Sequence, residues 1–374
     1  MPTRVVFGDG ALQDAGQLIT EILGSRRPAL VTDKGIVDSG ILKPLLSQTG
    51  NIPVFDGIEA NPRSTSVDQI GTAIRGLQND LIIAVGGGSA IDAGKAVALL
   101  ATNPGSIETY EGRERYQNPP LPLLAIPTTC GTGSEVTWVA VITHPERKFK
   151  MSIKGPHMFP VAAIVDPDLL TSLPPALIAA TGMDALTHAI EAYTARPASP
   201  LTDLFALRAI RLTAGSIRDA TGDIRKNTPA RSDIMLGSTL AGFAFGNSDV
   251  GAVHCISESI GALFDIPHGV ANAVFLPHVM SFNAPACMDR YAEIAGLFGI
   301  SSGNPARRTE ALIAHIKALS ADLGIPSFSS LNIDESRFPQ IAESAYRNNS
   351  NPSNPRPAES RDYLAILAAA AGDG

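Results

Sequence analysis

The chain has 374 residues, enough for two or three folding units with sizeable cores. Its net charge is −7, with 29 Lys and Arg against 36 Asp and Glu, and this acidic balance argues against a nucleic acid as the partner. The 34 glycines and 28 prolines favour a turn-rich globular enzyme over a coiled coil or a disordered chain.

The three cysteines, Cys130, Cys255 and Cys287, are odd in number and lack Cys-x-x-Cys spacing. They predict neither a disulfide framework nor a cysteine-based zinc site, and they fit a reducing compartment. The first ten residues lack an apolar signal sequence, and the longest apolar stretch, 81–100, is interrupted by glycines and charged residues. We therefore expect a soluble, cytoplasmic protein without a membrane partner.

Short apolar runs beside Gly or Pro turns recur in the first 170 residues, as in RRPALVTD, NDLIIAVGGGS and FPVAAIVDPDLL. These runs predict buried strands, and they alternate with helix-like stretches at 11–23, 66–77 and 90–101. The alternation indicates an α/β domain over residues 1–172, with a parallel sheet covered by helices on both faces.

After residue 172 the chain changes to long Ala- and Leu-rich segments of helical period, at 176–195, 200–220 and 229–245. Strand patterns nearly vanish, so we expect an all-helical second domain over residues 173–374. The segment 347–357 (RNNSNPSNPRP) is expected to form an exposed turn before a last short helix.

A glycine-rich loop, GGGS at 86–89, stands between a predicted strand and a predicted helix. Glycines let the backbone approach an anion closely, and the N-terminus of the helix stabilises its charge, so the loop is a candidate phosphate site. A tight strand-to-helix turn without a ligand is the alternative. The segment IPTTCGTGSEVT supplies hydroxyl groups after another predicted strand, although a self-capped turn explains them equally well. Two such loops together suggest a dinucleotide crevice.

Asp33 ends a third predicted strand. A carboxylate there can accept hydrogen bonds from an adenosine ribose and repel a 2′-phosphate, which favours NAD over NADP. The alternative is that Asp33 only caps the following helix.

One aspartate and three histidines form the candidate metal site. Asp184 and His188 lie four residues apart on a predicted helix and share one of its faces, although a core histidine bonded to an aspartate is the alternative. His254 and His268 would lie about 21 Å apart on one straight helix, but the break at Asp265-Ile266-Pro267 allows the chain to bring them together. This donor set suits Fe(II) or Zn(II), and iron fits slightly better because it leaves room for a substrate oxygen.

Together the motifs GGGSAIDAGK, PTTCGTGSEVT, GMDALTHAIEAY, PHGVANAVFLPHVM and NPRP resemble those of the iron-containing (group III) alcohol dehydrogenase family, over nearly the whole chain. The resemblance implies a Rossmann-like domain followed by a helical domain, NAD(P) bound beside the metal, and a dimer. It places the metal ligands at Asp184, His188, His254 and His268. It places cofactor contacts at Asp33, Gly87, Gly88, Ser89, Thr128, Thr129, Thr132, Lys150 and Leu169, with Asn61 and Phe245 near the cofactor or substrate.

The sequence departs from the family pattern at Glu258, where the family usually has a histidine beside the nicotinamide. A carboxylate there can relay a proton or repel an anionic substrate, and we take Glu258 and the ligand His268 as candidate catalytic residues. Trp138 and Arg63 also suggest a specialised pocket, although packing explains the first and a solvated surface charge explains the second.

We therefore expect a metal-dependent oxidoreductase that transfers a hydride between NAD(H), rather than NADP(H), and a small alcohol or aldehyde whose oxygen the metal polarises. A glycerol dehydrogenase-like or maleylacetate reductase-like enzyme is the first alternative. A lyase resembling dehydroquinate synthase is less favoured, because the metal motifs lack a matching cluster of Lys and Arg. A metal-free binding protein is disfavoured by the complete set of four ligands.

Overall fold

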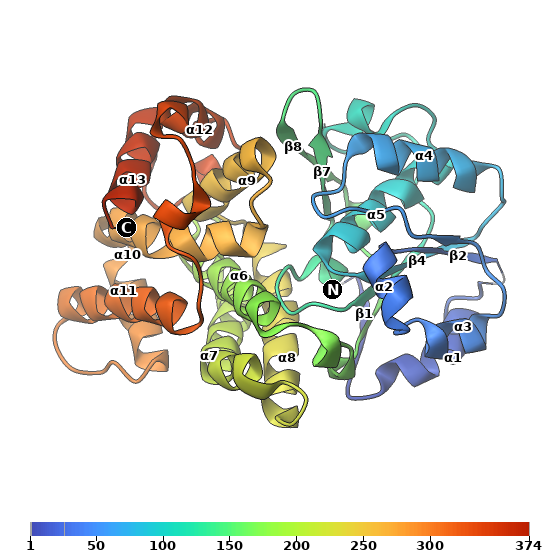
Figure 1. Ribbon diagram of the computed structural model, residues 1–374, viewed down its shortest axis with the longest axis horizontal. Helices are drawn as coiled ribbons and strands as arrows, with labels where there is room; N and C mark the ends of the chain where they lie inside the picture. Colours follow the sequence, from blue (N-terminus) through green and yellow to red (C-terminus); the bar gives the residue numbers. More distant parts are fainter. Residues whose placement is uncertain (1, 26, 374) are drawn as a thin grey trace. The chain divides into compact units, whose positions relative to one another are not determined.

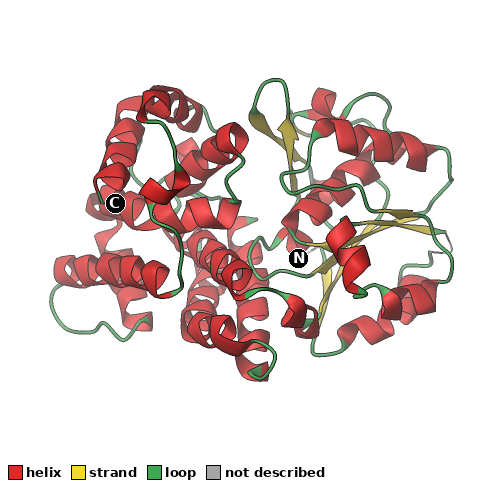
Figure 2. Cartoon of the chain, viewed as in Figure 1, coloured by secondary structure: helices red, strands yellow, loops and turns green. Residues whose placement is uncertain are grey.

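Two compact units make up the chain in the computed structural model, which describes residues 2–25 and 27–373. The first unit contains the chain up to residue 129 together with 133–172, and the second contains 130–132 together with the chain from 173 onward. Strands are found in the first unit, whereas the second is helical (Figure 2). Across the described residues, none of the helices is both long enough and apolar enough to span a bilayer.

The main sheet of the first unit is six-stranded and parallel throughout (Figure 1). Its four inner strands are fully buried, as is typical of a parallel sheet covered on both faces. In spatial order the strands are β1 (Arg4–Phe7), β9 (Ala162–Val165), β6 (Leu123–Pro127), β4 (Leu81–Gly86), β2 (Pro28–Val31) and β3 (Val54–Phe55).

The strand order reverses between β2 and β4. From β2 the chain continues to its neighbour β3, whereas from β4 it continues to β6 on the opposite side. The loops that follow β2 and β4 therefore leave their shared border in opposite directions, and in open α/β sheets such a border is the usual place for a ligand.

Helices of the first unit follow the predicted periodicity where it is strong. The predictions at 66–77 and 90–101 are confirmed by α4 (Ser64–Arg75) and α5 (Gly88–Thr102). The helix-like stretch predicted at 11–23 is helical over residues 11–22, although it passes from a 3-10 segment through the short α1 (Ala15–Gln17) to a π segment and is not one regular α-helix. Two further helices, α2 (Lys34–Ser39) and α3 (Lys43–Thr49), lie between β2 and β3.

A second, three-stranded sheet was not predicted. It consists of β5 (Gly112–Arg113), β8 (Phe149–Lys154) and β7 (Val139–His144), with β7 and β8 forming an antiparallel hairpin. The buried Lys95 of α5 holds the start of β7 against that helix, because its Nζ donates to Thr137 Oγ1 (3.1 Å) and to the carbonyl of Val139 (2.7 Å).

The second unit is all-helical, and this confirms the predicted order of an α/β fold followed by a helical one. From Ile178 onward α6 is buried on almost every side, because α7, α8 and α10 pack around it. The helices are α6 (Pro175–Thr194), α7 (Pro200–Asp223), α8 (Thr228–Phe245), α9 (Ala252–Phe264), α10 (His268–Leu297), α11 (Pro305–Asp322), α12 (Phe338–Tyr346) and α13 (Ser360–Gly372).

Candidate metal and cofactor sites

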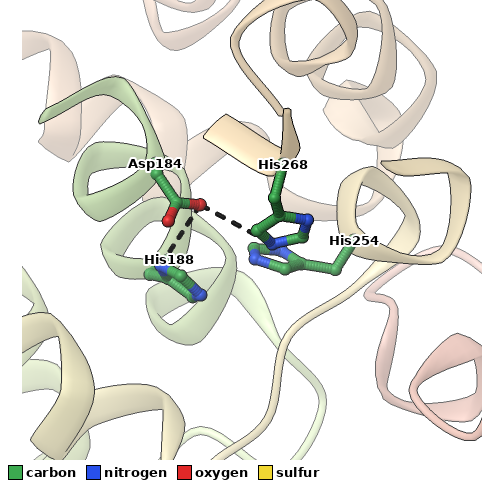
Figure 3. Close-up of side chains that lie close together, drawn as sticks. All are labelled: Asp184, His188, His254 and His268. Carbon is green, nitrogen blue, oxygen red and sulfur yellow. Dashed lines mark ion pairs between the residues drawn. The ribbon is translucent and has the colours of Figure 1, made fainter. Parts of the chain in front are cut away.

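The four side chains that the sequence marks as metal ligands converge from three helices of the second unit (Figure 3). Asp184 and His188 lie one turn apart on α6, His254 lies in the first turn of α9, and His268 begins α10. One potential ligand atom from each residue lies within 4.8 Å of all the others. Asp184 Oδ1 is 3.6 Å from His188 Nδ1 and 3.7 Å from His268 Nε2.

The turn between α9 and α10 brings the last two histidines together. Asp265 ends α9 in the left-handed conformation (φ 58°), and Pro267 precedes the first residue of α10. As a result, the ring centroids of His254 and His268 lie 5.2 Å apart. The predicted chain reversal at 265–267 is therefore confirmed.

The burial and protonation of His188 and Asp184 fit a divalent metal ion. His188 Nδ1 is buried without a hydrogen-bond partner, which is costly unless another group satisfies its lone pair or proton. Burial lowers the pKa of His188 to about 4, so its imidazole is neutral at pH 7. Burial disfavours the charge of Asp184, but the neighbouring imidazoles hold the pKa of its carboxyl below the ordinary value. A neutral imidazole and an ionised carboxylate are the forms that bind metals.

The spacing of the cluster also suits coordination. Imidazole nitrogen and carboxylate oxygen bind Zn(II) at about 2.0–2.2 Å, so two ligand atoms of one ion are roughly 4 Å apart at most. The 4.8 Å limit observed here is close to that spread. The side chain of His268 is 26% exposed, whereas those of His188 and His254 are 6% and 4% exposed, so the cluster is most accessible beside His268.

Two residues that contact the ligands were missed by the sequence reasoning. Glu191 Oε2 lies 2.5 Å from His254 Nδ1, and Asn272 Nδ2 donates to Asp184 Oδ1 over 2.6 Å. Helical spacing could have predicted both. Glu191 lies seven residues after Asp184 on α6 and Asn272 lies four after His268 on α10, so each shares a helix face with a ligand.

Phe245, expected near the cofactor or substrate, packs against a metal-ligand candidate. Its ring stacks on His188 with centroids 4.4 Å apart and planes at 19°. The structure therefore gives Phe245 a contact that restricts the rotation of the His188 ring.

Glu258 lies one helical turn after His254 on α9. Its Oε2 accepts a hydrogen bond from Asn348 Nδ2 over 2.6 Å. Asn348 belongs to the segment that was expected to form an exposed turn, and that expectation is wrong for part of it, since Ser350 and Asn354 are buried. Glu258, the residue that departs from the family pattern, therefore lies one turn along the helix from a candidate metal ligand. Its carboxylate is held by Asn348 of the loop before the last helix.

The glycine-rich loop and the first part of the hydroxyl-rich loop meet in the first unit. Gly87 is the N-cap of α5, and Gly88 and Ser89 form its first turn. Thr128 N donates to the carbonyl of Gly86 (2.9 Å), and a Cβ on Gly87 would lie 3.2 Å from Thr129 Cγ2. The backbone at Gly87 is therefore packed closely against the end of β6, with the helix N-terminus beside it.

The other expected cofactor residues are distributed more widely. Asp33 caps α2, with its Oδ1 accepting from Ile36 N (3.0 Å), as the alternative interpretation of this residue predicted. Lys150 Nζ donates to Asn61 Oδ1 (2.9 Å), and Asn61 adopts a left-handed conformation (φ 55°). The side chain of Leu169 belongs to the core of the first unit, whereas Thr132 belongs to the second.

Trp138 makes contacts that fit its packing alternative, and Arg63 is exposed, which fits its alternative of a solvated surface charge. Trp138 stacks on Phe159, with ring centroids 6.4 Å apart, and the guanidinium of Arg113 lies 4.9 Å from its ring centroid. Arg63 pairs with Thr143 in an isolated β-bridge, and its backbone N–H donates to the Glu59 carboxylate over 3.2 Å.

Comparison with known proteins shows which family the chain is related to over most of its length. Residues 2–167 match the family described as iron-containing alcohol dehydrogenase, and residues 178–371 match the C-terminal part of the Fe-containing alcohol dehydrogenase family. The chain belongs to the iron-containing alcohol dehydrogenase family. It is therefore an enzyme of an oxidoreductase family, and the resemblance drawn from its motifs is confirmed.

Individual relatives match over nearly their full length. The chain is 42% identical over 376 residues to 1,3-propanediol dehydrogenase of Klebsiella pneumoniae, covering 98% of this chain and 97% of the relative. It is 35% identical to the NAD-dependent methanol dehydrogenase of Bacillus methanolicus, covering 98% of each. A crystal structure of a 1,3-propanediol oxidoreductase superimposes with a TM-score of 0.95 at 41% identity, covering 99% of this chain and 98% of the other.

Proposed function

We propose that this enzyme transfers a hydride between NAD(H) and a short, uncharged alcohol or aldehyde at a metal centre formed by Asp184, His188, His254 and His268. The observation that carries the proposal is the convergence of these four side chains from α6, α9 and α10, with their ligand atoms within 4.8 Å of one another. This donor set supports an ion that prefers nitrogen and carboxylate ligands.

Fe(II) is the proposed metal, with Zn(II) as the alternative. The family description supports iron, and one carboxylate with three imidazoles suits either ion. A divalent ion bound there would polarise the oxygen of an alcohol or aldehyde as a Lewis acid. The greater exposure of His268 supports substrate access on its side of the cluster, and makes it the ligand that we propose to lie nearest the reacting atoms.

NAD(H) is the proposed cofactor. The loops after β4 and β6 present the N-terminus of α5, whose first N–H groups have no intrahelical partner and can bind a pyrophosphate. Asp33 follows β2, which borders β4 where the strand order reverses, and its carboxylate supports NAD over NADP. The NAD-dependent methanol dehydrogenase among the relatives supports the same choice. We propose Asn61, Gly87, Gly88, Ser89, Thr128, Thr129, Thr132, Lys150 and Leu169 as the other cofactor contacts.

Glu258 supports an uncharged substrate. Its carboxylate lies one helical turn from His254, so an anionic substrate would meet a like charge there. The names of the relatives, a 1,3-propanediol dehydrogenase and a methanol dehydrogenase, point to uncharged alcohols as well. A homodimer located in the cytoplasm is a further proposal, supported by the family resemblance and tested by light scattering and cell fractionation.

The test uses protein purified without oxygen, stripped with a chelator and reloaded with Fe(II) or Zn(II). NADH or NADPH consumption is followed with glycolaldehyde, an uncharged aldehyde, and with glyoxylate, an anion of similar size. The expected result is metal-dependent consumption of NADH, faster with glycolaldehyde. Turnover that is unchanged in the stripped protein, or absent with every aldehyde after full metal loading, would contradict the proposed function.

A further inference from the structure

Glu191 connects α6 to the start of α9 inside the second unit. The side chain is buried, at 5% exposure, and each of its carboxylate oxygens has a different partner. Oε1 accepts from the backbone N–H of Val253 over 2.8 Å, and Oε2 lies 2.5 Å from His254 Nδ1. We infer that Glu191 is a positioning residue for the metal centre, fixing both the ring orientation and the tautomer of His254. The inference rests on the proposed function.

The tautomer follows from the chemistry of the pair. An ionised carboxylate only accepts hydrogen bonds, so the imidazole atom that faces it must carry a hydrogen. With the hydrogen on Nδ1, the lone pair of neutral His254 is on Nε2. That atom faces the other ligands, because Asn272 Nδ2 lies 3.1 Å from it and 2.6 Å from Asp184 Oδ1. Glu191 therefore directs the lone pair of His254 into the cluster, as carboxylates do for histidine ligands of metals in general.

The orientation follows from the start of α9. The first N–H groups of a helix need partners, and here Asn354 Oδ1 accepts from Ala252 N (3.1 Å) while Glu191 accepts from Val253 N. A negative charge at this end also interacts favourably with the helix dipole. The same carboxylate thus holds both the backbone that carries His254 and the ring itself.

Gly251 allows this close approach. A Cβ on Gly251 would lie 2.8 Å from Asn354 Oδ1 and 3.1 Å from Glu191 Oε1, so a larger residue would push both acceptors away. The acceptor Asn354 is itself held by Asn283, through reciprocal amide hydrogen bonds of 3.0 and 2.8 Å. The NPRP motif of the loop before the last helix is therefore part of the support of His254, a role that the proposed cofactor and substrate contacts do not include.

The variant Glu191→Gln tests the inference. The introduced glutamine keeps the size of the side chain, and its carbonyl can still accept from Val253 N–H, so the start of α9 is preserved. Its amide group, however, presents hydrogens to Nδ1, and His254 must then carry its own hydrogen on Nε2, facing the ligands. We expect affinity for Zn(II) or Co(II), measured by competition with a chromophoric chelator, to fall by about 10–100-fold.

A matched control is Glu293→Gln on α10, whose carboxylate accepts from Tyr193 Oη over 2.5 Å and touches none of the four ligands. Its metal affinity should stay within about twofold of the wild type. The visible spectrum of bound Co(II) adds a readout that loss of stability alone does not change, because a lost or displaced imidazole alters the coordination. Thermal unfolding of the metal-free variants tests whether both are folded.

The tautomer is measured separately, from the ¹⁵N shifts of His254 in the metal-free wild type at an alkaline pH where the imidazole is neutral, because contact with Glu191 raises the pKa of His254. There Nδ1 is expected to carry the only hydrogen. A hydrogen on Nε2 instead, or Glu191→Gln binding metal as tightly as the wild type, would overturn the inference. A wild type with the expected tautomer that binds no metal contradicts the proposed function instead. If Glu191→Gln does not fold, the inference is tested by the tautomer of His254 in the wild type alone.

Discussion

Asn354 Oδ1 accepts a hydrogen bond from the backbone N–H of Ala252 over 3.1 Å, which ties the last loop of the chain to the helix that carries His254. The two residues lie 102 positions apart in the sequence, and the contact is buried. Through it, an asparagine in a loop of polar composition completes the N-terminus of a helix at the metal centre.

Replacing Asn354 by Ala should therefore destabilise the protein and weaken metal binding together. The change leaves Ala252 N–H and the Asn283 amide buried without this partner, which costs about 1–3 kcal/mol of unfolding free energy. Urea unfolding of the metal-free protein measures the loss. The exposed Asn51 is the control, since Asn51→Ala should unfold at nearly the wild-type urea concentration. Equal midpoints for the two variants would show that the Asn354 contact does not stabilise α9.

The fold class was predictable because its signals are local. Buried strands such as β4 are continuous apolar runs, and helices such as α4 repeat apolar residues at helical spacing. The hairpin of β7 and β8 was missed because its residues only alternate between buried and partly exposed positions, so no long apolar run marks it. The stretch 11–23 has helical composition and is helical over residues 11–22, but its sequence did not show that 3-10, α and π geometry follow one another there.

The candidate site was predictable only in part, for a related reason. Asp184 and His188 share one helix face, and Pro267 marks the turn that separates His254 from His268, so sequence patterns point to all four ligands. Glu191 is different, because nothing local shows that its partners lie on α9. Asn354 likewise looks like a surface residue until its partners from α9 and α10 are known.

His268→Ala should remove the metal without removing the cofactor. His268 is the most exposed of the four ligand candidates, and its loss leaves one carboxylate and two imidazoles. Metal affinity should fall further than it does when a residue that only supports a ligand is replaced, a change that typically costs about 10–100-fold. Metal content after dialysis should drop and turnover should cease, whereas NADH binding, followed by fluorescence titration, should persist. A variant that retains both its metal and its turnover would remove His268 from the proposed site.

Glu258→Gln should change which aldehyde is accepted. Like charges a few ångströms apart repel by roughly 1–4 kcal/mol depending on the local dielectric, so removing this charge should raise kcat/KM for glyoxylate by about fivefold or more. The value for uncharged glycolaldehyde should stay within about twofold. If both substrates instead lose activity to the same extent, Glu258 relays a proton and does not select the substrate. Asn348→Ala, which removes the partner of Glu258 and keeps the charge, is the matched control.

Lys95 should make stability depend on alkaline pH. It is 1% exposed, and burial lowers its pKa to about 8, although the nearby carboxylates of Asp92 and Glu135 oppose this shift. An unfolded lysine titrates near pH 10.4, so between about pH 8 and 10.4 the unfolded chain binds more protons than the folded one. The unfolding free energy must then rise with pH across this window, because the cost of burying the charge disappears as the folded lysine loses its proton.

Comparison of the wild type with Lys95→Met by urea unfolding at pH 7 and pH 10 isolates this contribution. The wild type should gain up to ~3 kcal/mol relative to the variant between the two pH values. At pH 7 the variant should still be the less stable, because it leaves the partly buried Asp92 without its cation and Ser134 and Thr137 without the Lys95 donor. Lys226→Met, at a side chain that is 88% exposed, should show no such pH-dependent difference. A constant difference between the wild type and Lys95→Met would mean that Lys95 titrates like an exposed lysine, and that its contacts with the hydroxyl-rich loop do not depend on its charge.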